Sequence, residues 1–214
     1  MLKIYGTSMS RAGRALWAAE EVGVKFEHIP VAIGAAGSRQ PDHLKINPNG
    51  HVPAIDDDGA IIWESMAIGL YLAEKYGKPP LWPSKIEDRG HAYQWSFWGI
   101  TEIEPHLISV FANRVMLPKE QRSEEAAKSA LDALKAPLKV LDDHLAKRAY
   151  LLGSDFTIAD LNLASVLILA PMIQLDMSSV PAAKAWLDKC LGRPAAARAR
   201  AYKKVAIRAA HPDG

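Results

Sequence analysis

The pattern of apolar and polar positions begins as a strand and then becomes a helix. Residues 2–5 alternate as a strand does, and small and apolar side chains then recur at helical spacing from Ala12 to Val22. Gly23 is a typical helix stop at that point. A second strand begins at Phe26, and a loop that contains several Gly and Ser residues follows it.

The next segment, residues 47–66, has the pattern of a strand–turn–strand–helix unit. Pro53 interrupts a strand pattern, which predicts a sheet edge or a tight bend and permits a cis bond after Val52. Asp58-Gly59 lies between two apolar runs and predicts a hairpin. Ser65 opens an apolar-periodic segment, so we expect it to be the N-cap of a helix.

A boundary is predicted at residues 77–84, where three prolines in five residues cannot continue a helix. The order before it is β-α-β, a loop or short helix, and then β-β-α, while the pattern after it is helical throughout. The predicted fold class is therefore α/β plus all-α. A thioredoxin-like domain would span residues 1–78, and an all-helical domain would span residues 86–214.

The first helices of the second domain carry prolines whose effects the sequence leaves open. Residues 86–104 place four side chains on one stripe, and Pro105 is expected to kink or end that helix. The stripe consists of His91, Trp95, Trp98 and Glu102. A further amphipathic helix is predicted from Ser123 to about Leu145, although Pro137 lies inside it.

Thr157 and Asp160 have the spacing of a capping box, with the acid in the usual Glu/Gln position. The helix that follows is apolar on all sides, which predicts the buried axis of the helical domain. We therefore expect Asp160→Ala to misfold. The basic, alanine-rich segment from Arg193 to Arg208 is better explained as an amphipathic closing helix with a solvated charged face than as a nucleic-acid contact.

Composition excludes several classes. Apolar residues make up 49% and charged residues 23%, as in soluble globular proteins, and a net charge of +2 is too small to indicate a nucleic-acid partner. The single Cys190 excludes an internal disulfide, fits a reducing compartment and is expected to be a buried filler. No signal peptide, membrane-length apolar run or metal-ligand spacing is evident, so we expect a cytoplasmic protein without a metal or membrane partner.

The start of the helix after Glu64-Ser65 offers a site for an amino-acid end. Helix N-termini carry unpaired N–H groups and partial positive charge, which suit a carboxylate, while Glu64 can accept from an ammonium group. The Val52 backbone beside a cis proline could pair with an extended peptide-like ligand. The unit therefore suits a small peptide held by its main chain and its amino-acid terminus.

The run N-P-x-G-x-V-P-x-I, followed by D-x-G and W-E-S-x-A-I, resembles the glutathione-binding half of the cytosolic glutathione transferase superfamily. The resemblance implies a cis bond before Pro53, a pairing of Val52 with the cysteinyl backbone of glutathione, and a γ-glutamyl group held by Glu64 and Ser65. It extends to the second domain through the capping box, Trp186-Leu187 and Arg193-Pro194-Ala195.

The loop after the first strand resembles that of the serine-type (theta- and delta-like) transferases, in which a catalytic serine precedes an arginine by four. Carried over, this makes Ser10 the catalytic hydroxyl and Arg14 its partner. The alternative reading of Ser10 is a plain N-cap. Tyr5 is the runner-up, because the tyrosine-type branch uses a tyrosine at the end of the first strand.

Two positions depart from the family pattern. Ser38 stands where delta-like members often have a histidine, and His51 stands where lysine is frequent. Either Arg39 or His51 is expected to reach the glycine carboxylate of glutathione, and a solvated loop residue is the alternative for His51. The cysteine that the beta-like branch uses near position 10 is absent.

The resemblance places Trp98 and Glu102 at the site of an apolar electrophile, whereas the ordinary reading of this aromatic stripe is helix core or dimer contact. It implies a homodimeric, detoxifying glutathione transferase, with glutathione as co-substrate, a small hydrophobic electrophile as partner, and no permanently bound cofactor. A glutathione-dependent disulfide reductase or peroxidase and a non-catalytic binding protein on the same fold are the alternatives.

Overall fold

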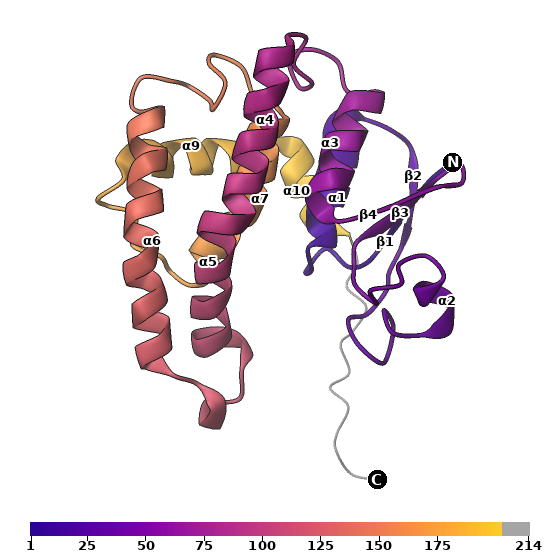
Figure 1. The fold of residues 1–214 in the computed structure, drawn as a ribbon, viewed down its shortest axis with the longest axis horizontal. Helices are drawn as coiled ribbons and strands as arrows, with labels where there is room; N and C mark the ends of the chain where they lie inside the picture. The colour runs from indigo at the N-terminus through magenta and orange to yellow at the C-terminus, as the bar shows by residue number, and fades with distance from the viewer. Residues whose placement is uncertain (203–214) are drawn as a thin grey trace. The chain divides into compact units, whose positions relative to one another are not determined.

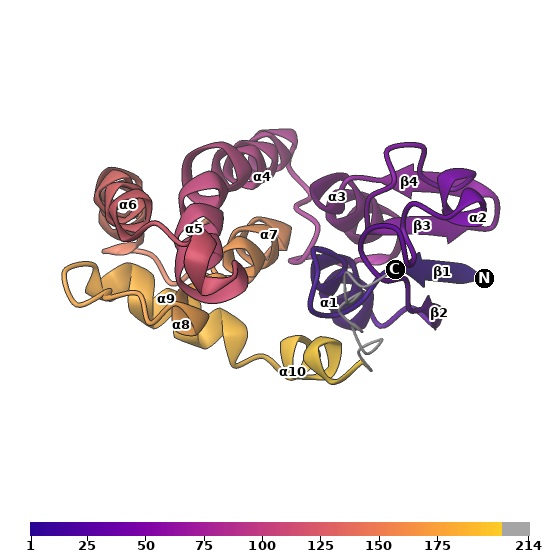
Figure 2. The ribbon, with the colours of Figure 1, turned by 90° about the horizontal axis from the view of Figure 1, so that it is seen from below.

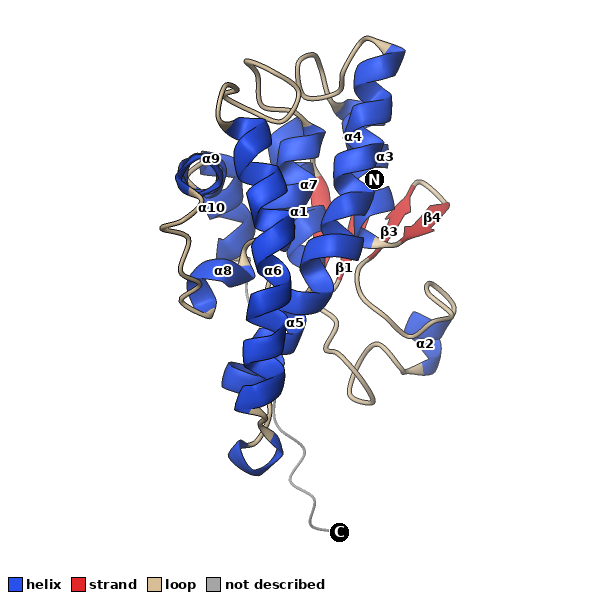
Figure 3. Cartoon of the chain, turned by 60° about the vertical axis from the view of Figure 1, so that its left-hand side comes forward, coloured by secondary structure: helices blue, strands red, loops and turns tan. Residues whose placement is uncertain are grey.

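The computed structural model describes residues 1–202 and divides them into two compact units. The first unit comprises Met1–Gly77 together with the segment that starts at Pro194, and the second comprises Lys78–Arg193. Figure 1 traces both units along the chain, and Figure 3 shows that strands occur in only one of them within the described residues.

The first unit is built on a mixed four-stranded sheet in the order β2-β1-β3-β4. β1 pairs with β2 in parallel and with β3 antiparallel, and β3 pairs antiparallel with β4. The helices α1 and α3 pack on each other and on the sheet, as Figure 2 shows. The elements are β1 (Leu2–Tyr5), α1 (Ala12–Val22), β2 (Phe26–Ile29), α2 (Pro41–Leu44), β3 (Ala54–Asp57), β4 (Ala60–Trp63), α3 (Ser65–Tyr76) and α10 (Pro194–Ala201).

Local signals account for most of these boundaries. Gly23 ends α1 in the left-handed conformation, with φ of 70°, and its N–H donates to the carbonyl of Ala19. Asp58 and Gly59 both have positive φ, which is the signature of a type I′ turn, and the hairpin predicted between β3 and β4 is confirmed. The bond between Val52 and Pro53 is cis, as the resemblance implied.

A buried carboxylate fastens the hairpin to α3. The Asp57 side chain has no exposed surface and accepts hydrogen bonds from Lys75 Nζ at 2.7 Å, Tyr71 Oη at 2.8 Å and Tyr76 Oη at 2.7 Å. Burial raises the pKa of Asp57, but these hydrogen bonds outweigh it and hold the pKa below its ordinary value.

The second unit is helical within the described residues. Its elements are α4 (Ile86–Trp98), η1 (Gly99–Ile103), α5 (Glu104–Phe111), η2 (Ala112–Met116), η3 (Lys119–Gln121), α6 (Glu124–Leu145), α7 (Ile158–Val166), α8 (Leu169–Met172) and α9 (Pro181–Leu191). Every residue of α7 is buried, which confirms the predicted central helix. Asn162 of α7 donates to Ser96 Oγ of α4 at 2.9 Å inside this core.

Two prolines lie within the helical segments of this unit. Pro105 lies in the first turn of α5, directly after the π-helical turn η1 that separates α5 from α4. A wider turn is a common way to absorb the backbone bond that proline cannot make. Pro137 lies inside α6, which nevertheless runs unbroken and buries Leu134, Leu138 and Leu141 along one side.

The closing segment differs from the sequence expectation. The predicted helical domain extended to residue 214, but α10 belongs to the first unit, where it packs against α1. Its small side chains Ala195, Ala196 and Ala199 are buried there, so the helix approaches its neighbour closely. The remaining part of the predicted closing helix, residues 203–208, lies outside the described residues.

Candidate functional site

Ser10 lies in the loop between β1 and α1, one residue before the N-cap Arg11. Its Oγ donates to the carbonyl of Thr7 at 2.8 Å and accepts from the N–H of Ala12 at 3.1 Å. The hydroxyl is half-buried at the N-terminus of α1, whose first turn contains no acidic residue. A negative charge beside this hydroxyl would therefore meet the positive end of the helix without local repulsion.

Close backbone packing joins this loop to the segment before Pro53. Gly6 has φ of +129°, and a Cβ built on it would lie 2.5 Å from Ala12 Cβ and 3.0 Å from Val52 Cβ. Only a residue without a side chain fits between them. The start of the loop and Val52 are thus neighbours within the first unit.

Val52 offers an unused backbone edge. Antiparallel pairing of β3 with β1 ends at Ala54, and within residues 1–202 neither backbone group of Val52 has a backbone partner. The residue is half-buried, so an extended ligand could add to the sheet edge at this point.

The turn before Val52 is held by two buried side chains that the sequence analysis did not single out. His43 Nε2 and Asn47 Nδ2 each lie 2.9 Å from the carbonyl oxygen of His51. Because a carbonyl only accepts, His43 must carry its proton on Nε2. Asn47 belongs to the N-P-x-G motif and could have been found from it, whereas no local pattern marks His43.

Glu64 and Ser65 lie at the start of α3, but their roles differ from the expectation. The N-cap is Glu64 rather than Ser65, and Ser65 is the first helical residue. Ser65 is buried, and its Oγ accepts from Arg14 Nη1 at 3.2 Å. The buried guanidinium of Arg14 thus links α1 to the N-terminus of α3.

The backbone of Glu64 adopts an unusual conformation, with φ of 73° and ψ of 115°. A non-glycine residue at positive φ is costly, and such residues gather at binding and catalytic sites. The side chain is exposed beside the free N–H groups of the first turn of α3. A carboxylate and a set of donors therefore lie next to each other, as an amino-acid end would require.

The two residues considered for the glycine carboxylate border the same turn. Arg39 and His51 are both exposed, and Arg39 Cγ would lie 3.3 Å from a Cβ placed on Gly50. Ser38 is fully buried, and its Oγ accepts from the N–H of Gly34 at 3.0 Å. Ser38 therefore serves the loop itself, whereas Arg39 and His51 are exposed beside the turn.

The runner-up Tyr5 is half-buried at the end of β1, where its ring packs edge-on against His43 with 6.2 Å between centroids. In the second unit Trp98 is half-buried and stacks in a T shape on buried Trp95 at 5.1 Å, while Glu102 is exposed on η1. Their proposed contacts with an electrophile remain predictions.

Other site classes find no support in the described part of the chain. Residues 1–202 contain no group of three or more His, Cys, Asp or Glu side chains placed to hold a metal ion. Cys190 is fully buried in α9, as expected of a filler. None of the helices that the structure describes is long and apolar enough to cross a bilayer.

Comparisons with known proteins agree with this geometry. The family described as "Glutathione S-transferase, N-terminal domain" matches residues 1–74, and "Glutathione S-transferase, C-terminal domain" matches residues 106–194. Glutathione S-transferase F9 of Arabidopsis thaliana is 36% identical over 168 residues, which are 75% of this chain and 77% of the relative.

Elongation factor 1-gamma of Prunus avium is 38% identical over 160 residues, which are 73% of this chain but only 36% of that relative. Among solved structures, the theta class glutathione S-transferase of Xanthomonas axonopodis pv. citri with glutathione bound is 31% identical. It superimposes with a TM-score of 0.86 over 94% of this chain and 98% of that one. With both family domains matched over most of its length, the chain belongs to the glutathione S-transferase family and is a glutathione transferase.

Proposed function

We propose that this transferase activates the thiol of glutathione with the hydroxyl of Ser10 and transfers the glutathionyl group to a small apolar electrophile. The observation that carries the proposal is the position of Ser10 Oγ, half-buried at the acid-free N-terminus of α1 in the loop whose first residue, Gly6, packs closely against Val52.

The energies are sufficient for this role. A cysteine thiol titrates near ~8.5, and lowering that pKa by about two units requires roughly 3 kcal/mol of preferential interaction with the thiolate. A hydrogen bond to a charged acceptor supplies about 1.5–3 kcal/mol. The helix N-terminus adds up to ~1 kcal/mol at a partly exposed site. The two interactions together supply the roughly 3 kcal/mol required, without a metal ion.

The resting geometry sets one condition on this mechanism. The Ser10 proton points at the carbonyl of Thr7, so glutathione must draw it away from that acceptor. The exchange replaces a neutral hydrogen bond with a charge-assisted one, which is the stronger of the two. The thiol proton leaves to solvent, the thiolate attacks the electrophile, a carbon–sulfur bond forms and any leaving group departs with its electron pair.

The same proposal assigns the rest of glutathione. The backbone of Val52, before cis Pro53, would pair with the cysteinyl main chain, and the γ-glutamyl end would lie at Glu64 and the first turn of α3. Arg39 or His51 would bind the glycine carboxylate. Arg14 would act as a positioning residue, because its bond to Ser65 fixes the start of α3 relative to α1.

Two substitutions test the assignment of the hydroxyl. Ser10→Ala should raise the pKa of enzyme-bound glutathione, followed by the ultraviolet absorbance of the thiolate, and should lower turnover of chlorodinitrobenzene. Tyr5→Phe is the matched control, because it also removes a single hydroxyl near the loop. If Tyr5→Phe raises the thiol pKa and Ser10→Ala does not, the assignment is wrong.

We also propose that the protein works as a homodimer. In the edge strand β4, Ile61 is 40% exposed and Trp63 is 41% exposed. Exposed apolar side chains at a sheet edge are usually buried against another segment or a second subunit. Sedimentation of the wild type and of Trp63→Glu tests this. A wild type that sediments as a monomer would refute the proposal.

A non-catalytic binding protein is the second candidate, and the match to a relative with a different role in its name favours it. Retention on glutathione-agarose without turnover of chlorodinitrobenzene or of a glutathione mixed disulfide would support that alternative. Turnover of the disulfide alone would instead indicate a disulfide reductase.

A further inference from the structure

The C-terminal helix α10 reaches back to the catalytic loop of the first unit. It packs along α1, as Figure 2 shows, and Tyr202 follows directly after its last residue. The contacts of Tyr202 lead from α10 through β2 to the loop that carries Ser10.

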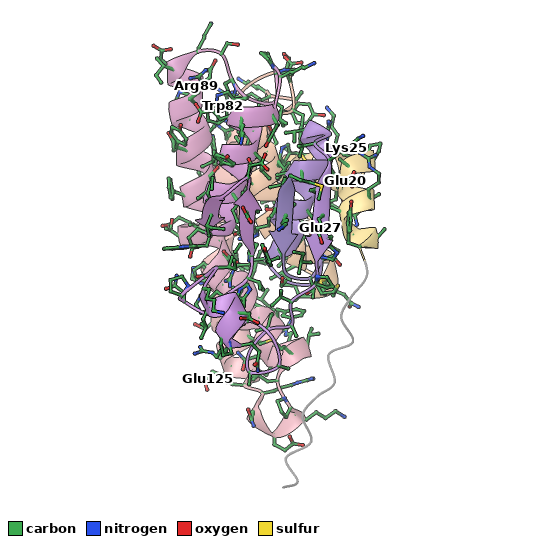
Figure 4. All side chains as sticks on the ribbon, turned by 90° about the vertical axis from the view of Figure 1, so that its right-hand side faces the viewer. Glu20, Lys25, Glu27, Trp82, Arg89 and Glu125 are labelled. Carbon is green, nitrogen blue, oxygen red and sulfur yellow. The ribbon has the colours of Figure 1, made fainter. Side chains whose placement is uncertain are left out.

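The first contact is at Glu20 of α1. The Tyr202 hydroxyl donates to Glu20 Oε1 at 2.5 Å, and Arg198 Nε donates to Glu20 Oε2 at 2.5 Å. Burial and the bond to Glu20 raise the pKa of Tyr202 to about 12, so the hydroxyl keeps its proton at neutral pH. Figure 4 shows Glu20 on the side of α1 that faces α10.

The second contact is made by the ring of Tyr202 on β2. Its centroid lies 5.4 Å from that of Phe26 and 5.2 Å from that of His28, the latter edge-on. Nε2 of His28 in turn lies 2.8 Å from the carbonyl oxygen of Gly6, which is the first residue of the catalytic loop. The ring therefore supports the side chain that holds the start of the loop.

The third contact is direct. The hydroxyl of Ser8 donates to the carbonyl oxygen of Tyr202 at 3.0 Å, across 194 positions of the sequence. Gly6 and Ser8 are thus both held through Tyr202, and they bracket Thr7. The carbonyl of Thr7 accepts the hydrogen bond that the Ser10 hydroxyl donates.

We propose that Tyr202 is a positioning residue for thiol activation: it clamps the loop at Gly6 and Ser8 so that the hydroxyl of Ser10 is aimed at the sulfur of glutathione. The proposal rests on the proposed role of Ser10. It also gives a functional reason for the packing of α10 and Tyr202 with the first unit.

The decisive variant is Ser8→Ala, which removes the bond to the Tyr202 carbonyl and leaves α10 and its packing intact. Tyr202→Ala removes the ring and the bond to Glu20 as well. Ala197→Ser, on an exposed position of α10, is the matched control. All three are measured in the full chain for thermal stability, bound-thiol pKa, kcat, and KM for glutathione.

We expect Ser8→Ala to raise the pKa of bound glutathione by roughly half a unit and Tyr202→Ala by about one unit, which at limiting thiolate lowers kcat about tenfold. KM for glutathione should change less than about twofold, because the loop contributes little to ground-state binding. A purely structural role would lower the melting temperature without this split between kcat and KM.

If Ser10→Ala raises the thiol pKa while Ser8→Ala leaves the thiol pKa and kcat at wild-type values, Tyr202 does not position the loop. This proposal then fails, but the proposed function of Ser10 stands. If Ser10→Ala has no effect either, the proposed function fails with it. Should Tyr202→Ala not fold, the result for Ser8→Ala decides.

Discussion

Asp160 is the residue whose loss should cost the helical unit most. Its Oδ1 accepts from the N–H of Leu151 at 2.8 Å and from Trp186 Nε1 at 2.9 Å. Its Oδ2 accepts from the N–H and the hydroxyl of Thr157 at 2.9 and 3.0 Å. One buried carboxylate thus joins the loop before α7, the capping box of α7 and the side chain of α9.

Removing the carboxylate leaves buried hydrogen-bond donors that cannot reach water. The side chain of Asp160 is fully buried, and this burial raises its pKa. In Asp160→Ala the hydroxyl of Thr157 can turn away, but the two N–H groups and the indole N–H remain buried and unpaired. At about 1–3 kcal/mol each, three such donors cost roughly 3–9 kcal/mol. A domain is stable by only about 5–15 kcal/mol, so we expect misfolding.

The assay compares soluble yield and melting temperature for three variants. Asp160→Ala should be insoluble or unfolded, and Asp160→Asn should be intermediate, because its amide oxygen keeps part of the acceptor capacity. Asp155→Ala, at a nearby exposed carboxylate, is the control and should melt as the wild type does. A soluble Asp160→Ala with an unchanged melting temperature would refute the reasoning.

Three further outcomes are expected. Because the pKa of Asp57 is lowered in the folded protein, its carboxylate stabilises the fold above the ordinary carboxyl pKa of ~4, and this stabilisation is lost as pH falls through the lowered pKa of the folded state. Asp57→Asn should therefore make the melting temperature depend less on pH in the acid range, and an unchanged dependence contradicts this. His43→Phe removes a hydrogen bond worth about 1 kcal/mol to the turn before Val52, so KM for glutathione should rise about fivefold at constant kcat. A fall in kcat with an unchanged KM would contradict this prediction. Gly6→Ala combines overpacking with the strain of a positive φ and should lower the free energy of unfolding by about 2–6 kcal/mol. Gly59→Ala should cost less, because no atom lies within 4 Å of its new Cβ, and equal melting temperatures for the two variants would disprove this.

Sequence patterns predicted the elements whose causes are local. The Asp58-Gly59 turn, the stop at Gly23 and the all-buried helix after Thr157 each depend on neighbouring residues, and the structure confirms all three. A cap depends on the exact residue at which a helix begins, and there the prediction for Ser65 was wrong by one position. Ser65 is instead the first helical residue, and its hydroxyl accepts from Arg14 of α1, a contact that no local pattern predicts.

Long-range contacts account for the remaining differences. No local signal assigns α10 to the first unit, because alanines and arginines at helical spacing fit any helical neighbour. The assignment comes from Glu20 and Ser8, which meet Arg198 and Tyr202 across more than 170 positions of the chain, as the separations of 178, 182 and 194 residues show. His43 is a different case: its contact with the His51 carbonyl spans only eight positions, but no local pattern marks this histidine as buried.

Two sets of contacts hold backbone segments on which the proposed glutathione site depends. The resemblance assigns roles to Val52, Pro53, Glu64 and Ser65, but the proposed site also needs a fixed turn before Val52 and a fixed loop before α1. His43 and Asn47 hold the first through one carbonyl, and Tyr202 holds the second through Gly6 and Ser8. Because a hydroxyl must be aimed closely to activate a thiol, Tyr202 should influence turnover without touching glutathione, and no local sequence pattern marks it for this role.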